Sequence, residues 1–143
     1  MERRNFISLS CKSCMAVAFA GSISSVLESC GGTSSIYKTE LKNDALQVPT
    51  SQFQPNQNYL LVRNAEMEYD IVVIKNENSY RAFYLQCTHE NQPLSVNDKN
   101  IRCSSHGSIF GFDGKVLNGP ADKPLQQYST QVENGFITIK TKA

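Results

Sequence analysis

The sequence has no tryptophan, only two histidines and no excess of charge of either sign. With 14 basic and 13 acidic residues its formal net charge is +1, which argues against a nucleic-acid-binding protein. No apolar run approaches the roughly 20 residues that a bilayer-spanning helix requires, so a polytopic membrane protein is excluded. The 143 residues suffice for one domain with its own core, and the five cysteines therefore need not form a disulfide scaffold.

The first thirty residues have the layout of an export signal. Arg3 and Arg4 precede a stretch of small and moderately apolar residues from Ile7 to Leu27, whose apolar positions do not keep to one helical face. The stretch from Arg3 to Ile7 resembles the twin-arginine motif of signal peptides that export folded proteins, commonly around a cofactor. We therefore expect residues 1–29 to be a removable signal peptide.

A lipoprotein-like cleavage site follows this signal. Residues 27–30, Leu-Glu-Ser-Cys, resemble the bacterial lipobox, in which the cysteine becomes the lipidated first residue, although Glu28 departs from the pattern. The sequence thus predicts a lipid anchor on Cys30 and a place in the periplasm or cell envelope, and the alternative is an unmodified Cys30. Residues 30–45 are assigned to a flexible tether, and a first strand within residues 36–55 is left open.

From residue 46 onward the pattern is that of short β-strands. Runs of β-branched and aromatic residues are separated by polar turn clusters, among them Asp113-Gly114 and Glu133-Asn134-Gly135. Residues 46–143 are therefore predicted to form one all-β, antiparallel domain of about seven to nine strands, a small sandwich or barrel. The predicted strands cover residues 59–62, 71–74, 80–85, 100–102, 108–110, 125–132 and 136–140.

Two cysteines and the only two histidines fall into two close pairs. One residue separates Cys87 from His89, two residues separate Cys103 from His106, and thirteen residues lie between the pairs. Each pair follows a predicted strand, so loops from neighbouring strands can bring all four side chains to one metal site. The ordinary alternative is a pair of buried cysteines and two unrelated histidines, but chance accounts poorly for this clustering.

The spacing of these pairs resembles that of the Rieske iron–sulfur family. In that family two cysteines bind one iron of a [2Fe–2S] cluster and two histidines bind the other. The stretch from Cys103 to Ser108 matches the second ligand motif of the family at four of six positions, and Gly119-Pro120-Ala121 resembles the loop that covers the cluster. The resemblance implies a small antiparallel β fold with two cluster-binding loops and one [2Fe–2S] cluster per chain.

The same resemblance assigns individual residues. The implied metal ligands are Cys87, His89, Cys103 and His106, with the cysteines on the inner iron and the histidines on the outer iron. Beside the cluster it places Gly107, Ser108 and Pro120, with Ser108 donating a hydrogen bond to a bridging sulfide.

Three positions depart from the Rieske proteins of cytochrome bc complexes. Gln92 and Ser105 stand where those proteins have a pair of disulfide-bonded cysteines, so that bridge cannot form here. Phe110 stands where they have a tyrosine that donates a hydrogen bond to the cluster. Because such hydrogen bonds stabilise the reduced cluster, one lost donor predicts an intermediate potential within the Rieske range of roughly −150 to +300 mV.

The predicted function is electron transport by a metal-binding protein that serves a redox partner, either a cytochrome or an oxidoreductase subunit. No histidine remains for a second metal centre, and no nucleotide-binding glycine motif is present, so we expect no catalytic activity from the chain alone. Two alternatives stay open. One is the small subunit of a larger oxidoreductase, and the other is a non-redox module with a structural Cys₂His₂ zinc site.

A docking surface for the partner is also expected beside the histidines. Pro93 and Leu94, which follow His89, are interpreted as exposed, and with Gly107 they would form a small apolar patch. The alternative is ordinary loop packing.

Overall fold

The computed structural model describes residues 36–77 and 79–142. The predicted signal peptide, residues 1–29, and the predicted lipidation site Cys30 lie outside the described residues. Within the described ranges, no helix is long and apolar enough to cross a membrane.

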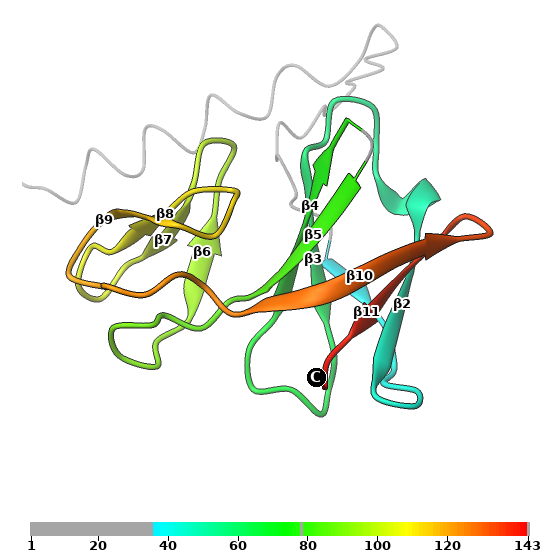
Figure 1. Cartoon of the computed structure of the whole chain (residues 1–143), viewed down its shortest axis with the longest axis horizontal. Coiled ribbons are helices and arrows are strands. Elements are labelled where there is room, and N and C mark those ends of the chain that lie inside the picture. The colour runs from blue at the N-terminus through cyan, green and yellow to red at the C-terminus, as the bar shows by residue number, and fades with distance from the viewer. Residues whose placement is uncertain (1–35, 78, 143) are drawn as a thin grey trace, which may run out of the picture. The chain divides into compact units, whose positions relative to one another are not determined.

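The regular structure of the described residues consists of eleven strands and one short 3₁₀ helix (Figure 1). In chain order these are β1 (Ile36–Lys38), β2 (Ala45–Pro49), η1 (Thr50–Gln52), β3 (Tyr59–Arg63), β4 (Ile71–Asn76), β5 (Ser79–Tyr84), β6 (Leu94–Val96), β7 (Ile101–Cys103), β8 (Ile109–Phe110), β9 (Val116–Asn118), β10 (Gln127–Glu133) and β11 (Phe136–Lys140). Every predicted strand is present, and the all-β fold is confirmed. Ten strands, β2 to β11, stand where about seven to nine were expected, because β2, β6 and β9 were not predicted.

The strands form two sheets. A seven-stranded sheet has the order β1-β3-β4-β5-β10-β11-β2, and a four-stranded sheet has the order β6-β7-β8-β9. The smaller sheet is an insertion between β5 and β10, and β10 leads back into the larger sheet (Figure 1). All strand pairings are antiparallel except the parallel pairing of β1 with β3, and β1 lies before residues 46–143, for which the sequence predicted an antiparallel domain.

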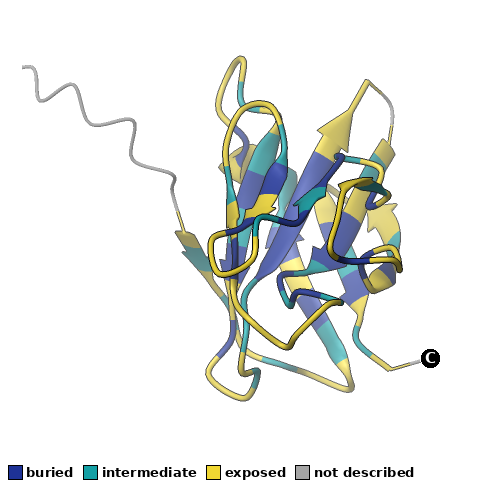
Figure 2. Ribbon diagram, turned by 90° about the vertical axis from the view of Figure 1, so that its left-hand side faces the viewer, coloured by how far each residue is buried: buried dark blue, intermediate teal, exposed yellow. Residues whose placement is uncertain are grey.

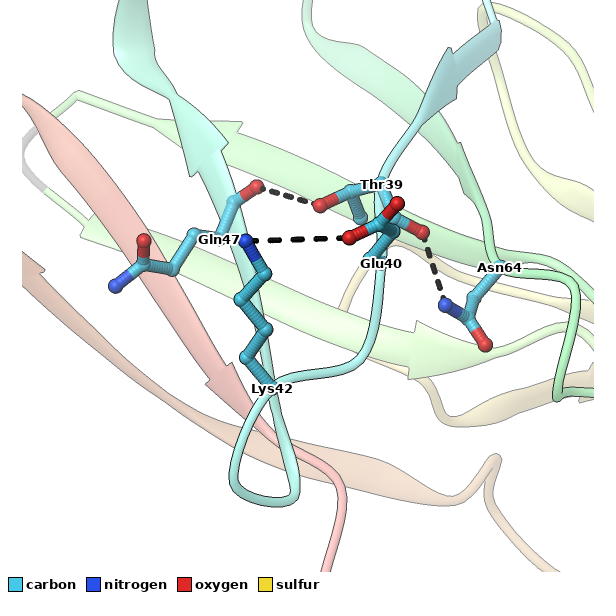
Figure 3. Close-up of polar contacts among 5 residues, drawn as sticks. All are labelled: Thr39, Glu40, Lys42, Gln47 and Asn64. Carbon is cyan, nitrogen blue, oxygen red and sulfur yellow. Dashed lines mark hydrogen bonds and ion pairs between the residues drawn. The ribbon is translucent and has the colours of Figure 1, made fainter.

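The larger sheet is curled almost into a barrel, and its two edge strands approach each other. The Thr39 hydroxyl, just after β1, donates to the carbonyl of Gln47 in β2 at 3.2 Å (Figure 3). On the other side, the buried Asn64 amide donates to the Thr39 carbonyl at 2.9 Å. The exposed ion pair between Lys42 and Glu40, at 3.9 Å, contributes little to this seam.

Strand β1 lies within the segment 30–45, which the sequence assigned to a tether. Its residues pair with β3, with Lys38 opposite Arg63, and the Thr39 N–H donates to the Arg63 carbonyl at 3.1 Å. For residues 36–38 the structure thus shows the first strand that the sequence left open. A strand of three residues, with only Tyr37 partly buried on the core, has too short an alternation to be recognised from sequence.

Two clusters of buried residues form the core. Figure 2 shows the buried residues in dark blue on the ribbon. Strand β4 is buried on both faces, because Ile71 and Val73 point into the first cluster while Val72 and Ile74 point into the second. The first cluster otherwise contains Leu46, Val48, Phe53, Leu60, Val62, Ala82, Tyr128, Ile137 and Ile139. The second otherwise contains Phe83, Leu85, Cys87, Leu94, Ile101, Cys103, Phe110, Ala121 and Leu125.

The turn between β8 and β9 gives a prediction about stability. Gly114 has φ +80°, and a Cβ there would lie 2.5 Å from Cε1 of the buried Phe83. Gly135 has nearly the same φ, +79°, but a Cβ there would meet only Thr50 Oγ1, at 4.0 Å. We expect Gly135→Ala to lower the free energy of unfolding by about 1 kcal/mol and Gly114→Ala by about 2–4 kcal/mol. Urea unfolding followed by circular dichroism measures both, and equal losses would contradict the role of Phe83.

Candidate metal centre

The four predicted ligands lie on two neighbouring loops. Cys87 and His89 are on the first ligand loop, residues 86–93 between β5 and β6. Cys103 is the last residue of β7, and His106 lies on the second ligand loop, residues 104–108 between β7 and β8. Because Leu94 at the start of β6 pairs with Cys103, the antiparallel pairing of β6 with β7 brings the two loops together.

Backbone hydrogen bonds close each loop on itself. In the first ligand loop, the Cys87 N–H donates to the Gln92 carbonyl at 2.8 Å. In the second, the Cys103 N–H donates to the Ser108 carbonyl at 2.9 Å, and the Gly107 N–H donates to the Cys103 carbonyl at 3.2 Å. Gly107 has φ +81°, a left-handed conformation that glycine adopts without steric cost.

The two thiols are free and buried, with exposed fractions of 1% for Cys87 and 0% for Cys103. Burial by itself would raise the pKa of Cys103. Hydrogen bonds to its sulfur from the backbone N–H groups of His106 and Ser105, and from the Cys87 thiol, outweigh burial and lower this pKa below the ordinary value. The lowered pKa favours the thiolate, which is the form of cysteine that binds metal.

The two imidazoles, in contrast, are exposed and face each other. The ring centroids of His89 and His106 are 5.1 Å apart, and the rings lie nearly perpendicular at 79°. A carboxylate oxygen of Glu90 lies 3.7 Å from Nδ1 of His106, and the ligating atoms of these three residues lie within 4.8 Å of one another. The sequence prediction did not include Glu90, although its position directly after His89 is a signal that could have found it.

A third loop, residues 119–126, follows β9 and is here called the covering loop. Its Ala121 N–H donates to the hydroxyl oxygen of Ser108 at 3.1 Å, and both residues are buried. The Ser108 hydroxyl keeps its own proton for a further acceptor. Pro120 is exposed on this loop. The structure therefore brings Gly107 and Ser108 onto the second ligand loop, with Pro120 on the covering loop beside them.

Side-chain hydrogen bonds also link the covering loop to both ligand loops. The Thr88 hydroxyl, between the first two predicted ligands, donates to the Lys123 carbonyl at 2.7 Å. The Asn118 amide, at the end of β9, donates to the Gly119 carbonyl at 3.1 Å and to the Gly107 carbonyl at 3.5 Å. Sequence reasoning missed these contacts because their acceptors are backbone carbonyls, which carry no sequence motif.

The prediction of an apolar docking patch is wrong for one of its three residues, Leu94. Leu94 is only 8% exposed, because it begins β6, pairs with Cys103 and packs in the second core cluster. Ordinary loop packing describes Leu94 correctly, whereas Pro93 is exposed as expected.

The chemistry of this donor set fits a two-iron cluster. Thiolates are suited to the buried iron of such a cluster, and neutral imidazoles to an iron near the surface. A family model described as "Rieske [2Fe-2S] domain" matches residues 45–129, which include all four predicted ligands. The chain belongs to the Rieske [2Fe–2S] family. Its cofactor is accordingly one [2Fe–2S] cluster, and it is a Rieske-type electron carrier.

Several relatives of this Rieske protein are subunits of cytochrome b6-f complexes. The iron-sulfur subunit of Chlorobaculum tepidum is 31% identical over 71 residues, which are 48% of this chain and 39% of the subunit. Subunit 3 of Nostoc sp. is 31% identical over 99 residues, covering 65% and 56% of the two chains. Subunit 1 of the same organism is 29% identical over 116 residues, covering 76% and 62%. The matched region thus spans between 39% and 62% of the length of these relatives.

Solved structures agree with the family. The plasma membrane Rieske protein PetC3 from Synechocystis PCC 6803 superimposes with a TM-score of 0.55 at 28% identity, covering 66% of this chain and 97% of that one. A naphthalene 1,2-dioxygenase chain superimposes with a TM-score of 0.56 at 24% identity, covering 71% and 27% of the two chains. The second likeness shows the fold alone.

The hydrogen bonds to the covering loop predict unequal effects on stability. Ser108→Ala leaves the buried Ala121 N–H without its acceptor, so we expect the free energy of unfolding to fall by about 1–3 kcal/mol. Thr88→Val removes a hydroxyl whose acceptor, the Lys123 carbonyl, is on an exposed residue that water can reach, so a loss below about 1 kcal/mol is expected. Urea unfolding of both variants tests this order, and the reverse order would show that the covering loop depends on Thr88 instead.

Proposed function

We propose that this protein is an exported, lipid-anchored one-electron carrier of the cell envelope, with Cys87, His89, Cys103 and His106 as ligands of its cluster. The observation that carries the proposal is the segregation of the donors: both thiols are buried and both imidazoles are exposed, on loops that face each other. This arrangement gives a redox centre one insulated side and one side open to a partner.

Each group of the protein has a definite part in this function. When bound, the cluster takes up and releases one electron. The thiolates of Cys87 and Cys103 would hold the cluster from within the second core cluster, where the buried side chains of Phe110 and Leu125 exclude water. The neutral imidazoles add no negative charge and so favour a higher reduction potential. The Ser108 hydroxyl has a proton to donate toward a sulfide, which favours the reduced state.

The grouping of the possible donor atoms supports a two-iron cluster over a structural zinc ion. A tetrahedral zinc site with bond lengths of about 2.0–2.3 Å needs its four donor atoms roughly 3.5 Å apart. Within the part of the chain that the structure describes, the close group of three possible ligands consists of His89, Glu90 and His106, and includes neither thiol. Separate sulfur and nitrogen pairs suit two metal ions better than one.

The partner and the location follow from the N-terminal motifs and the relatives. The twin-arginine-like stretch suits a protein that folds around its cluster before export, and the lipobox-like residues suit an anchor at Cys30. Relatives are iron-sulfur subunits of cytochrome b6-f complexes, which supports a membrane-bound or periplasmic redox protein, a cytochrome or an oxidoreductase subunit, as the partner.

Electron paramagnetic resonance of the dithionite-reduced full chain tests the ligand assignment. We expect a rhombic signal with two irons and two acid-labile sulfides per chain. Cys87→Ser, His89→Ala, Cys103→Ser and His106→Ala should each abolish it, because each removes a metal ligand.

Two matched variants serve as controls. Cys14→Ser changes a cysteine of the predicted signal peptide, and Glu90→Gln neutralises the acidic neighbour of His106, so both should retain the signal. Stoichiometric zinc with no signal in the wild-type protein would overturn the electron-transfer proposal in favour of a structural module.

Membrane attachment is tested separately. In a bacterial host that processes lipoproteins, the wild-type chain is expected in the membrane fraction with the added mass of a lipid, and Cys30→Ala in the soluble periplasmic fraction. The same fractionation of a variant with Arg3 and Arg4 changed to Lys should leave the protein in the cytoplasm. A Cys30→Ala variant that remains in the membrane fraction would refute the lipid anchor.

A further inference from the structure

The first ligand loop is held in place without a covalent link. Both cysteines of the described residues are free thiols, and Gln92 and Ser105 occupy the positions where a bridge would otherwise join the two ligand loops. The backbone bond from Cys87 to Gln92 closes the loop on itself but does not attach it to the rest of the fold. Contacts from outside the loop must therefore fix its position, and the hydrogen bond from Thr88 to the covering loop is one of them.

Tyr69 supplies such an attachment from the larger sheet. It lies on the β3–β4 loop, residues 64–70, and its hydroxyl donates a hydrogen bond of 2.6 Å to the carbonyl of Asn91. Asn91 follows Glu90 and lies two residues after His89 on the first ligand loop. The hydrogen bond thus joins the larger sheet to the loop segment that carries an exposed imidazole.

The β3–β4 loop is rigid enough to act as a support. Arg63 and Asp70, at its two ends, form a two-pronged ion pair with both N···O distances at 2.8 Å. The Asp70 carbonyl accepts from the N–H of Leu85, just after β5, at 2.9 Å. The Tyr69 ring packs edge-on against the Tyr84 ring, with the ring centroids 5.7 Å apart. The backbone N–H of Tyr69 donates to the Tyr84 hydroxyl at 3.2 Å. Tyr69 is therefore oriented independently of its own hydroxyl.

Side-chain packing alone does not fix the loop on this side. A cavity of about 720 Å³ is lined by the β3–β4 loop, including Met67 and Tyr69, and by Leu85, Pro93 and Leu94 at the two ends of the first ligand loop. This pocket is open to solvent, so the side chains that line it are not packed against one another across it. The directional bond from Tyr69 to Asn91 therefore carries more of the attachment than it would in a close-packed interface.

We propose that Tyr69 is a positioning residue for the metal centre, whose hydroxyl holds the first ligand loop, and with it His89, in register with the second ligand loop. The part about His89 rests on the proposed function, since it takes His89 as a cluster ligand. Burial, followed by a hydrogen bond with the nearby Glu68 carboxylate and by the charge of that carboxylate, raises the pKa of Tyr69, so its hydroxyl stays a protonated donor at neutral pH.

Tyr69→Phe is the decisive variant, because it removes the hydroxyl and keeps the ring against Tyr84. Loss of one hydrogen bond should make opening of the first ligand loop about three- to tenfold more frequent. In the full chain, we expect amide hydrogen exchange of residues 86–93 and the rate of cluster loss to a chelator to rise by this factor. We also expect a broader electron paramagnetic resonance signal, because the imidazole ligand samples more orientations.

Tyr80→Phe is the matched control on the same sheet. This variant also removes a tyrosine hydroxyl, but from β5. The Tyr80 ring packs on Phe53 with the ring centroids 5.3 Å apart. The backbone carbonyl of Tyr80, and not its hydroxyl, accepts a hydrogen bond from Thr130. This variant should keep the wild-type exchange of residues 86–93, the wild-type rate of cluster loss and the wild-type spectrum.

The outcomes separate this proposal from the proposed function. If wild-type protein binds the cluster and Tyr69→Phe matches it in loop exchange, cluster loss and spectrum, Tyr69 is not a positioning residue. If wild-type protein binds no cluster, the proposed function fails, while hydrogen exchange in the metal-free chain still decides whether Tyr69 holds the loop. Equal changes in Tyr69→Phe and Tyr80→Phe would reduce the effect to general destabilisation and overturn the proposal.

Discussion

Burial of two cysteines in an otherwise apolar cluster is the constraint on which the metal centre depends. Cys87 and Cys103 pack with side chains of both sheets, among them Phe83 from the larger sheet and Phe110 from the smaller. Apolar packing of this kind is close to crystalline in density, so it fixes the start of each ligand loop. The histidines follow two and three residues later, where the loops have left the core, and their exposure is a consequence of that short spacing.

Hydrogen bonds, rather than a disulfide, hold the ligand loops in position. Thr88 ties the first ligand loop to the covering loop, Ser108 ties the second ligand loop to the same segment, and Tyr69 ties the first ligand loop to the larger sheet. Each such bond contributes about 1 kcal/mol, much less than the 2–4 kcal/mol typical of a disulfide. The loops are thus held by several weak contacts rather than by one strong link.

The sequence was sufficient for the fold class and for the family, because both leave local patterns. Strong β-branched runs such as β4 are recognised directly, and the four predicted ligands are rare residues at short spacings. Strands β1, β2, β6 and β9 were not predicted. Three of them have only three residues, and β2 ends at a proline, which cannot donate a backbone hydrogen bond. Leu94 was misread because a leucine beside a loop histidine looks the same whether it faces solvent or begins a strand. Tyr69 left no signal, since its partner Asn91 is a distant carbonyl.

The predicted donors are divided between the two ligand loops. The position of one loop relative to the other therefore matters more for cluster binding than the geometry within either loop. Each loop contributes one thiol and one imidazole, so the sulfur pair and the nitrogen pair both bridge the two loops. A small displacement of the first ligand loop would therefore disturb both ends of a cluster at once. Both loops have contacts with the covering loop, but the second lies between two strands of one sheet, whereas the first joins the two sheets and is also hydrogen-bonded by Tyr69 of the larger one. A redox centre needs ligands held by rigid neighbours. For the first ligand loop, one such neighbour is the larger sheet, which contacts the loop through the hydrogen bond from Tyr69 to Asn91.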